Sequence, residues 1–174
     1  MLGDSSLKNP KEAHKWLHSA GEAGSLQAQR TLGVLYTYGI DGFDENIEAA
    51  VYWHKKAAEQ GDADAQNSLA VSYADGEGIQ KDDFEAVKWF RRAAEQGSTA
   101  AQFKLGFCYL KGIGVPKDEV EAVKWYRMAA EQGDAEAHCN LGRLYVNGTG
   151  VPKDEAEAVK WFRKAAELGS LEGG

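Results

Sequence analysis

Cysteine and proline are scarce in this 174-residue sequence, and long apolar segments are missing from it. The two cysteines, Cys108 and Cys139, are too few for a framework of disulfides. No apolar run approaches the roughly 18 residues of a membrane-spanning helix, so we expect no membrane insertion. The opening stretch MLGDSSLKNPK lacks the apolar core of a signal peptide. We therefore expect a soluble chain that is cytoplasmic or, if a leader was removed, periplasmic or secreted.

Positive charge is also in short supply. The chain has 20 Lys and Arg against 27 Asp and Glu, which gives a formal net charge of -7. Because binding to nucleic acid requires clustered Lys and Arg, this balance argues against nucleic acid as a partner. The three prolines stand against 20 glycines, a ratio typical of helices that are separated by tight turns.

Repetition is what the sequence has in abundance. The stretch EAVKWYRMAAEQG (121–133) returns with few changes at 157–169, 85–97 and 49–61, and a more divergent copy, EAHKWLHSAGEAG, occupies 12–24. All five tryptophans lie at the same place in these copies, at positions 16, 53, 89, 125 and 161, so the spacings are 37, 36, 36 and 36. A fixed period of this size is the mark of a stacked repeat array.

A second segment precedes each of the last four copies and also repeats. It runs over 25–39, 62–76, 98–112 and 134–148, opens on Ser or Asp, and closes on Gly. Ser and Asp are good N-cap residues, and Gly favours the left-handed backbone that ends helices. We call the helices predicted for these segments A helices, and those that carry the tryptophans B helices. The sequence NPKE (9–12) predicts the start of the first B helix, with its Asn as the cap.

Both helix types carry one stripe of small or apolar residues. In the third A helix, the residues that share a face of a 3.6-residue helix are Ala101, Leu105, Gly106 and Tyr109. A Gly beside the Leu costs about 1 kcal/mol of helix propensity, so we expect it to allow close approach of the neighbouring helix backbone. In the B helices the stripe consists of Trp and three Ala, and the indole is expected to fill the space that small residues leave.

Short loops connect each A helix to the next B helix: GEGIQKD (76–82), GIGVPKD (112–118) and GTGVPKD (148–154). The apolar residue of each loop is expected to tuck under the turn. Asp118 and Asp154 are expected to cap the B helices. Glu121 and Glu157 are expected to complete a capping box. The first such loop, 39–46, is one residue longer, which explains the spacing of 37.

The predicted architecture is all-α, a right-handed α–α superhelix or solenoid of stacked helix-turn-helix repeats of about 36 residues. We expect a single repeat domain over 1–174. Its parts are a leading helix (9–24), four repeats (25–61, 62–97, 98–133 and 134–169) and a tail (170–174). The closing sequence GSLEGG is similar to the beginning of a further, truncated A helix.

The pattern resembles the Sel-one-like repeat (SLR) family, a relative of the tetratricopeptide repeat. The motif that carries the resemblance is A-x-x-x-L-G-x-x-Y-x-x-G-x-G-V-x-x-D followed by E-A-x-x-W-x-x-x-A-A-x-x-G, and 101–133 is its fullest copy. The similarity covers about 9–169, although the first copy lacks the GxG loop and has Gly21 in place of the second Ala of its B helix. The resemblance implies an adaptor for protein–protein interaction, in bacteria often with host-contact or envelope roles. It implies no reaction and no cofactor.

By analogy with tetratricopeptide arrays, a partner would bind to the concave face that the A helices line. Candidate positions point away from the packing stripe and vary from copy to copy, while the stripe stays the same. Three rows of A-helix residues meet this description: Arg30, Asn67, Phe103 and Cys139; Val34, Val71, Phe107 and Arg143; and Tyr38, Asp75, Lys111 and Asn147. Aromatic and Arg side chains are the usual anchors of interfaces, which places Phe103, Phe107 and Arg143 first. The alternative is that Phe107 packs against the next repeat and that Phe103 is a lone exposed ring.

Other residues that carry chemistry have simpler interpretations. His14 and His18 have a spacing that suits a metal ion, but without a third ligand we expect a surface pair and no metal site. Cys108 aligns with Leu35, Ser72 and Leu144, which predicts a packed side chain. Cys139 aligns with the first row of candidate binding residues and is expected to be exposed, so a bridge between the two cysteines is not expected.

Three hypotheses about function follow. The first is a non-enzymatic module that holds a peptide or protein segment in the concave groove. The second is an architectural array that self-associates through its uncapped ends. The third is a β-lactam-type hydrolase, because Ser5-Ser6-Leu7-Lys8 matches the S-x-x-K nucleophile motif, but neither S-D-N nor K-T-G follows it. We expect no enzyme.

Overall fold

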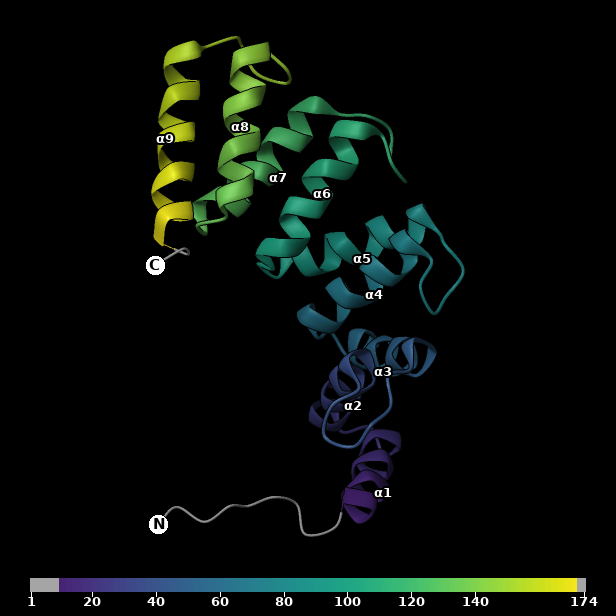
Figure 1. Ribbon diagram of the computed structural model, residues 1–174. Helices are drawn as coiled ribbons and strands as arrows, with labels where there is room; N and C mark the ends of the chain where they lie inside the picture. Colours follow the sequence, from purple (N-terminus) through teal and green to yellow (C-terminus); the bar gives the residue numbers. More distant parts are fainter. Residues whose placement is uncertain (1–9, 172–174) are drawn as a thin grey trace, which may run out of the picture. The chain divides into compact units, whose positions relative to one another are not determined.

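The computed structural model describes residues 10–171, which form nine α-helices and no β-strand. The A helices are α2 (Leu26–Tyr38), α4 (Ala63–Asp75), α6 (Thr99–Lys111) and α8 (Ala135–Asn147) (Figure 1). The B helices are α1 (Pro10–Glu22), α3 (Ile47–Glu59), α5 (Asp83–Glu95), α7 (Glu119–Glu131) and α9 (Glu155–Leu171). The prediction of an all-α repeat solenoid is confirmed. Asn9, the expected cap of α1, and the Ser5–Lys8 motif lie outside the described residues.

The helices group into two compact units, which divide between Lys81 and Asp82. In the first unit, α2 packs against both α1 and α3, and α3 packs against α4. In the second unit, each helix from α5 to α9 packs against the next one along the chain, and Figure 1 shows α8 and α9 side by side. Within each unit, neighbours in the sequence are therefore neighbours in space, as a repeat stack requires.

The helix ends follow the expected cap chemistry. At the start of α6, the Ser98 hydroxyl accepts a hydrogen bond from the backbone N–H of Ala101 at 3.4 Å. At its end, Gly112 adopts the left-handed conformation with φ of 72°, where a side chain would be strained. Asp118 and Asp154 cap α7 and α9, since each carboxylate accepts a backbone N–H at 2.9 Å. These caps are as the sequence predicts.

The second half of the predicted capping box is wrong. The backbone N–H of Asp118 donates to the carbonyl oxygen of Tyr109 at 2.9 Å, so it does not need the Glu121 carboxylate. Glu121 instead pairs with Lys124 at 2.8 Å. Glu157 likewise pairs with Lys160, while the N–H of Asp154 donates to the carbonyl of Tyr145. A capping box requires the backbone N–H of the cap residue as its donor. In both loops this N–H instead donates to a carbonyl oxygen of the preceding A helix.

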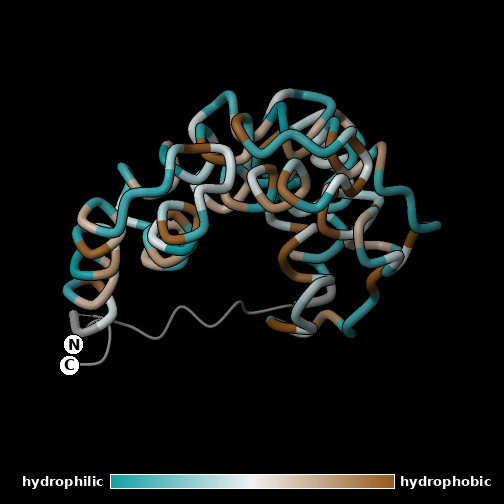
Figure 2. The backbone as a smooth tube through the Cα atoms, turned by 90° about the horizontal axis from the view of Figure 1, so that it is seen from above, coloured by the Kyte–Doolittle hydropathy of each residue, from teal (hydrophilic) through white to brown (hydrophobic). Residues whose placement is uncertain are grey.

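The core is built from the predicted stripes. The Leu of all four A helices is fully buried, and so is the matching Ala of the B helices α3, α5 and α7 (Leu32, Leu69, Leu105, Leu141; Ala57, Ala93, Ala129). Figure 2 shows hydrophobic and hydrophilic stretches alternating along the helices, as this one-sided burial requires. Trp53, Trp89 and Trp125 are buried, whereas Trp161 is half-buried and Trp16 of the first helix is 69% exposed. In the last loop, Val151 packs against the core of the second unit, as expected.

The glycines beside the A-helix Leu make room for a ring and not for a backbone, which corrects the expectation. A Cβ at Gly106 would lie 3.0 Å from the ring of Tyr126, and one at Gly142 would lie 2.6 Å from the ring of Phe162. A Cβ at Gly33 would collide with the imidazole of His54. In each case the ring belongs to the residue after the B-helix Trp. The helices interlock because a ring from the B helix fills the notch that Gly leaves.

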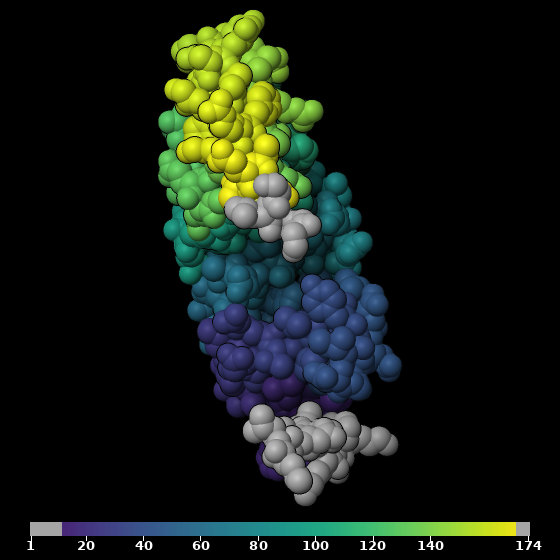
Figure 3. All heavy atoms as spheres, turned by 60° about the vertical axis from the view of Figure 1, so that its left-hand side comes forward, coloured from purple at the N-terminus to yellow at the C-terminus, as the bar shows by residue number. Residues whose placement is uncertain are grey.

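The last helix is longer than predicted. Gly169 lies inside α9, which continues to Leu171 instead of ending before a further A helix. Nothing lies within 4 Å of a Cβ added at Gly169, so no packing contact enforces a turn there. Figure 3 shows α9, in yellow, at the surface of the second unit. Residues 172–174 of the expected tail lie outside the described part of the chain.

Candidate functional site

Eight of the twelve predicted binding residues line two pockets, one in each unit. The pocket of the first unit is lined by Val34, Tyr38, Asn67 and Val71 of the predicted rows. The pocket of the second unit is lined by Phe107, Lys111, Arg143 and Asn147. Both pockets lie between two A helices, α2 and α4 in one case and α6 and α8 in the other. The two pockets therefore occupy equivalent places in the repeat.

The pocket of the first unit has a volume of about 250 Å³ and is mainly apolar. Ile47 and Val51 of α3 add to the apolar wall, and His54 lies beside them. Burial lowers the pKa of His54, and the nearby Asp62 carboxylate opposes this effect only in part. The imidazole is therefore mostly neutral at pH 7. The Oδ1 atom of Asn67 is buried and accepts no hydrogen bond from the described residues, which leaves an acceptor in the pocket lining.

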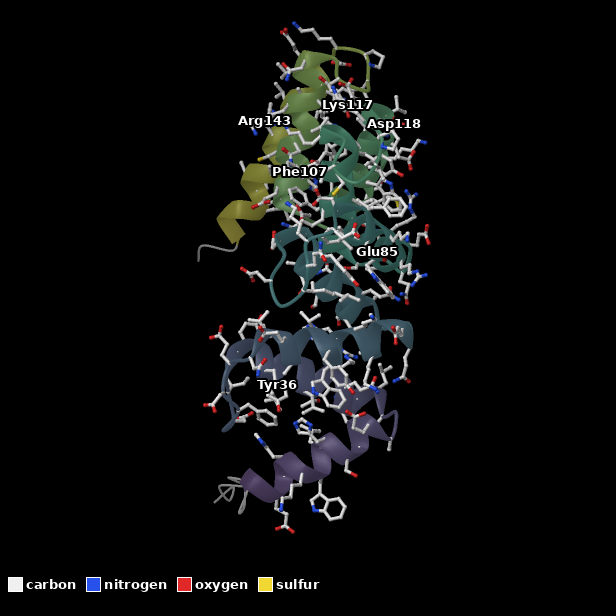
Figure 4. The ribbon with its side chains drawn as sticks, turned by 90° about the vertical axis from the view of Figure 1, so that its right-hand side faces the viewer. Tyr36, Glu85, Phe107, Lys117, Asp118 and Arg143 are labelled. Atoms are coloured by element: carbon white, nitrogen blue, oxygen red, sulfur yellow. The ribbon has the colours of Figure 1, made fainter. Side chains whose placement is uncertain are left out.

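The pocket of the second unit is larger, about 470 Å³, and more polar. Phe107 is 41% exposed in its wall. Arg143 and Lys117 also contribute, and Figure 4 shows the three labelled side chains on the same side of the second unit. Tyr126 also lines the pocket. It is almost fully buried, and this burial raises the pKa of its phenol. Here the pocket combines an exposed ring with positive charge.

The other four predicted residues do not line these pockets. Arg30 is held within the first unit, since its guanidinium lies 3.3 Å from Asp62 and 3.2 Å from Asp64. Asp75 and Cys139 are exposed at the surface. Phe103 is half-buried and its ring centroid lies 5.5 Å from that of Tyr126. Phe103 thus packs on the core as part of the second unit, and the alternative of a lone exposed ring is wrong.

The cysteines lie as predicted, but the histidines do not. Cys108 is buried and Cys139 is exposed, and both are free thiols. His14 and His18 are half-buried instead of forming a surface pair. His18 Nε2 lies 2.8 Å from the Tyr36 hydroxyl, and the ring of His14 lies close to that of Phe43 with the two planes tilted by 39°. Within residues 10–171 no group of three or more His, Cys, Asp or Glu could hold a metal ion.

Sequence reasoning missed a row of buried amides. Each Gln side chain of the row (Gln29, Gln66, Gln102) donates to a backbone carbonyl near the end of the preceding B helix (Gly21, Ala58, Ala94). Gln132 and Gln60 extend the row by donating to the Oε1 atoms of Gln102 and Gln29. The recurrence of Gln directly after the A-helix Ala was the available signal. His138 takes this place in α8 and packs beside Trp161.

These features define a class of protein, an all-α helical repeat solenoid with pockets between its A helices. The model of the Sel1 repeat matches residues 1–25, 26–62, 63–98, 99–134 and 135–170, and the chain belongs to this family. The family is in general a non-catalytic fold for protein interaction. None of the helices in the described chain has the length and hydrophobicity needed to cross a membrane.

Solved structures agree with this assignment. A Sel1 repeat protein from Oxalobacter formigenes is 44% identical with a TM-score of 0.83, over 91% of this chain and 65% of that one. The protective antigen c5321 of uropathogenic Escherichia coli, which displays an SLR fold, is 41% identical with a TM-score of 0.87. The alignment covers 93% of this chain but only 34% of that antigen. The cysteine-rich protein B of Helicobacter pylori, at 22% identity over 78% of this chain and 96% of that one and a TM-score of 0.55, shares the fold. No curated protein matches the chain.

Proposed function

We propose that this chain is a non-enzymatic interaction module that binds a peptide or protein segment on its A-helix face. The observation that supports the proposal is the equivalence of the two pockets. The A-helix Leu and the B-helix Ala and Trp that pack the core are the same in both units, while pocket positions change from Val34 and Val71 to Phe107 and Arg143. Stability alone does not require this difference, because the exposed pocket side chains contribute little to the core.

A peptide library displayed as internal segments can test the proposal. Segments selected on the wild-type chain are then measured by titration against Phe107→Ala, and we expect at least tenfold weaker binding because an exposed aromatic anchor is lost. Phe84→Ala is the matched control, since Phe84 is 60% exposed on the B helix α5, away from the pocket lining. Equal losses in both variants, or no loss in either, would refute binding at the A-helix face.

Phe103→Ala belongs in the same series for a different reason. Because the ring of Phe103 packs on Tyr126, we expect this change to reduce stability more than binding. If affinity falls strongly while the unfolding midpoint stays unchanged, Phe103 is a contact residue of the binding surface. The comparison separates a packed ring from a contact residue, which the sequence left open.

The second hypothesis, self-association through the ends, also has an observation in its favour. Trp16 of α1 is 69% exposed, and on α9 Val159 and Phe162 are 55% and 38% exposed. The same repeat positions are buried in α7, where Val123 and Tyr126 stand. Sedimentation at increasing concentration tests this hypothesis, with Trp16→Glu and Phe162→Glu as variants. An unchanging monomer mass for the wild-type chain would exclude it.

A further inference from the structure

Two cations of the second unit's pocket have no partner. Lys111 and Arg143 are exposed, and neither forms an ion pair or side-chain hydrogen bond with any described residue. The third cation of the pocket lining is engaged, since Lys117 pairs with Glu119 at 2.7 Å. In a chain of net charge -7, two free cations at one pocket form a local positive site.

Apolar and amide groups surround this charge. Lys111 lies one helical turn after Phe107 on α6, so both side chains lie along the same face. Arg143 reaches the pocket from α8, and Figure 4 shows it close to Phe107. Asn140 and Asn147 also line the pocket, where amides can donate to carboxylate or backbone oxygens. The pocket thus offers a ring, two cations and two amides.

The equivalent pocket of the first unit lacks this chemistry. No Lys or Arg lines it, and its one charged lining residue is Glu77. Positions 38 and 75 of the third row hold Tyr and Asp, where the second unit has Lys111 and Asn147. The positive site is therefore a property of the second unit and not of the repeat pattern.

We propose that the pocket of the second unit binds an acidic peptide segment, in which two carboxylate side chains meet Lys111 and Arg143 and an adjacent apolar side chain rests on Phe107. This inference rests on the proposed function of the chain as an interaction module. The two cations come from different helices, α6 and α8, so each can meet its own carboxylate within one acidic segment.

The test uses the selected library segments as synthetic peptides, acetylated and amidated so that no terminal charge remains. We expect acidic segments to dominate the selection. Replacing their Glu or Asp by Gln or Asn should weaken binding, and so should Lys111→Gln and Arg143→Gln, each by about threefold to fivefold, with a further loss in higher salt. Lys104→Gln is the matched control, because Lys104 is an exposed cation of α6 that does not line the pocket.

The outcomes separate the inference from the function on which it rests. Neutral or basic segments that depend on Phe107 but not on Lys111 or Arg143 would overturn the acidic partner and leave the interaction module standing. Segments that bind only when phosphorylated would overturn it as well. If no selected segment depends on Phe107, Lys111 or Arg143, both the inference and binding at this pocket are refuted.

Discussion

The indole of Trp53 lies directly against Gly21. A methyl group at Gly21 would lie 2.8 Å from Cζ3 of the indole and 2.9 Å from Cδ1 of Leu32. The other B helices have Ala at this repeat position, so the glycine looks like a departure from the pattern. In the structure it provides the space for a tryptophan that is 2% exposed.

The first prediction concerns Gly21→Ala. Alanine improves helix propensity by about 1 kcal/mol, but overpacking against Trp53 and Leu32 costs about 1–3 kcal/mol. We therefore expect a net loss of stability, measured as a lower urea midpoint. Gly169→Ala is the control, because Gly169 also lies in a helix but has no neighbour near an added Cβ. If Gly21→Ala is as stable as the wild type or more stable, as expected for Gly169→Ala, the contact of Gly21 with Trp53 and Leu32 is less tight than described.

The second prediction concerns the buried amide Gln102. Its side chain donates to the carbonyl of Ala94 at 3.1 Å and accepts from Gln132 at 2.8 Å. Gln102→Ala leaves a buried carbonyl without its donor, so we expect a loss of about 1–3 kcal/mol in the free energy of unfolding. Gln27→Ala, at an exposed position of α2, should change stability by less than about 0.5 kcal/mol. A similar small effect for both would show that the amide row does not stabilise the fold.

The third prediction concerns the two thiols. Burial raises the pKa of Cys108 to about 11, and the nearby Asp83 carboxylate adds to the effect. Because the thiolate is the reactive form, a thiol reagent at pH 8 should label Cys139 quickly and Cys108 only after unfolding. Cys139→Ser should then show almost no fast labelling. Rapid reaction of this variant in its native state would contradict the burial of Cys108.

The same shift predicts how stability depends on alkaline pH. The folded chain binds the Cys108 proton more tightly than the unfolded chain, whose thiol ionises near pH 8.5. The contribution to stability is therefore complete below that value and is lost as pH rises toward about 11. Unfolding midpoints of wild type and Cys108→Ala across this range test the sign, because the wild type should lose more stability than the variant.

The fourth prediction concerns acid pH and His54. Burial lowers the pKa of His54 below 6.5 despite Asp62, so the unfolded chain binds this proton more readily than the folded chain. Stability is then complete above about pH 6.5 and falls as pH decreases below it. His54→Phe, which has the ring found at the same position in α5 and α9, should show a weaker dependence between pH 7 and pH 5. An identical slope would show that His54 is not the group that titrates.

The sequence predicts the repeat unit well because that information is local. The caps at Asp118 and Asp154 and the buried Leu105 follow from one helix and its flanking residues. The capping box at Glu121 failed because the Asp118 amide has a partner in the preceding helix. Such a competing hydrogen bond depends on how two helices meet, which a single-helix argument does not contain.

The candidate site was predicted only in part for a related reason. Helical periodicity identifies the residues that face away from the packing stripe, and eight of them do line pockets. Helical periodicity within one helix does not show which of these residues a ring from the next helix covers. Tyr126 fills the notch at Gly106 and contacts Phe103, so Phe103 is partly covered while Phe107, one turn further on, remains exposed.

The hydrogen bond from the amide of Asp118 to the carbonyl of Tyr109 has a counterpart in the longer first loop, where Asn46 donates to Tyr36 at 2.9 Å. An additional residue has thus been absorbed without loss of the bond that closes the loop. The connections between A and B helices are consequently natural places for engineering. An affinity tag or a reporter peptide inserted between the exposed residues Asp44 and Glu45 would leave the buried Phe43 in the core and both flanking helices anchored to each other.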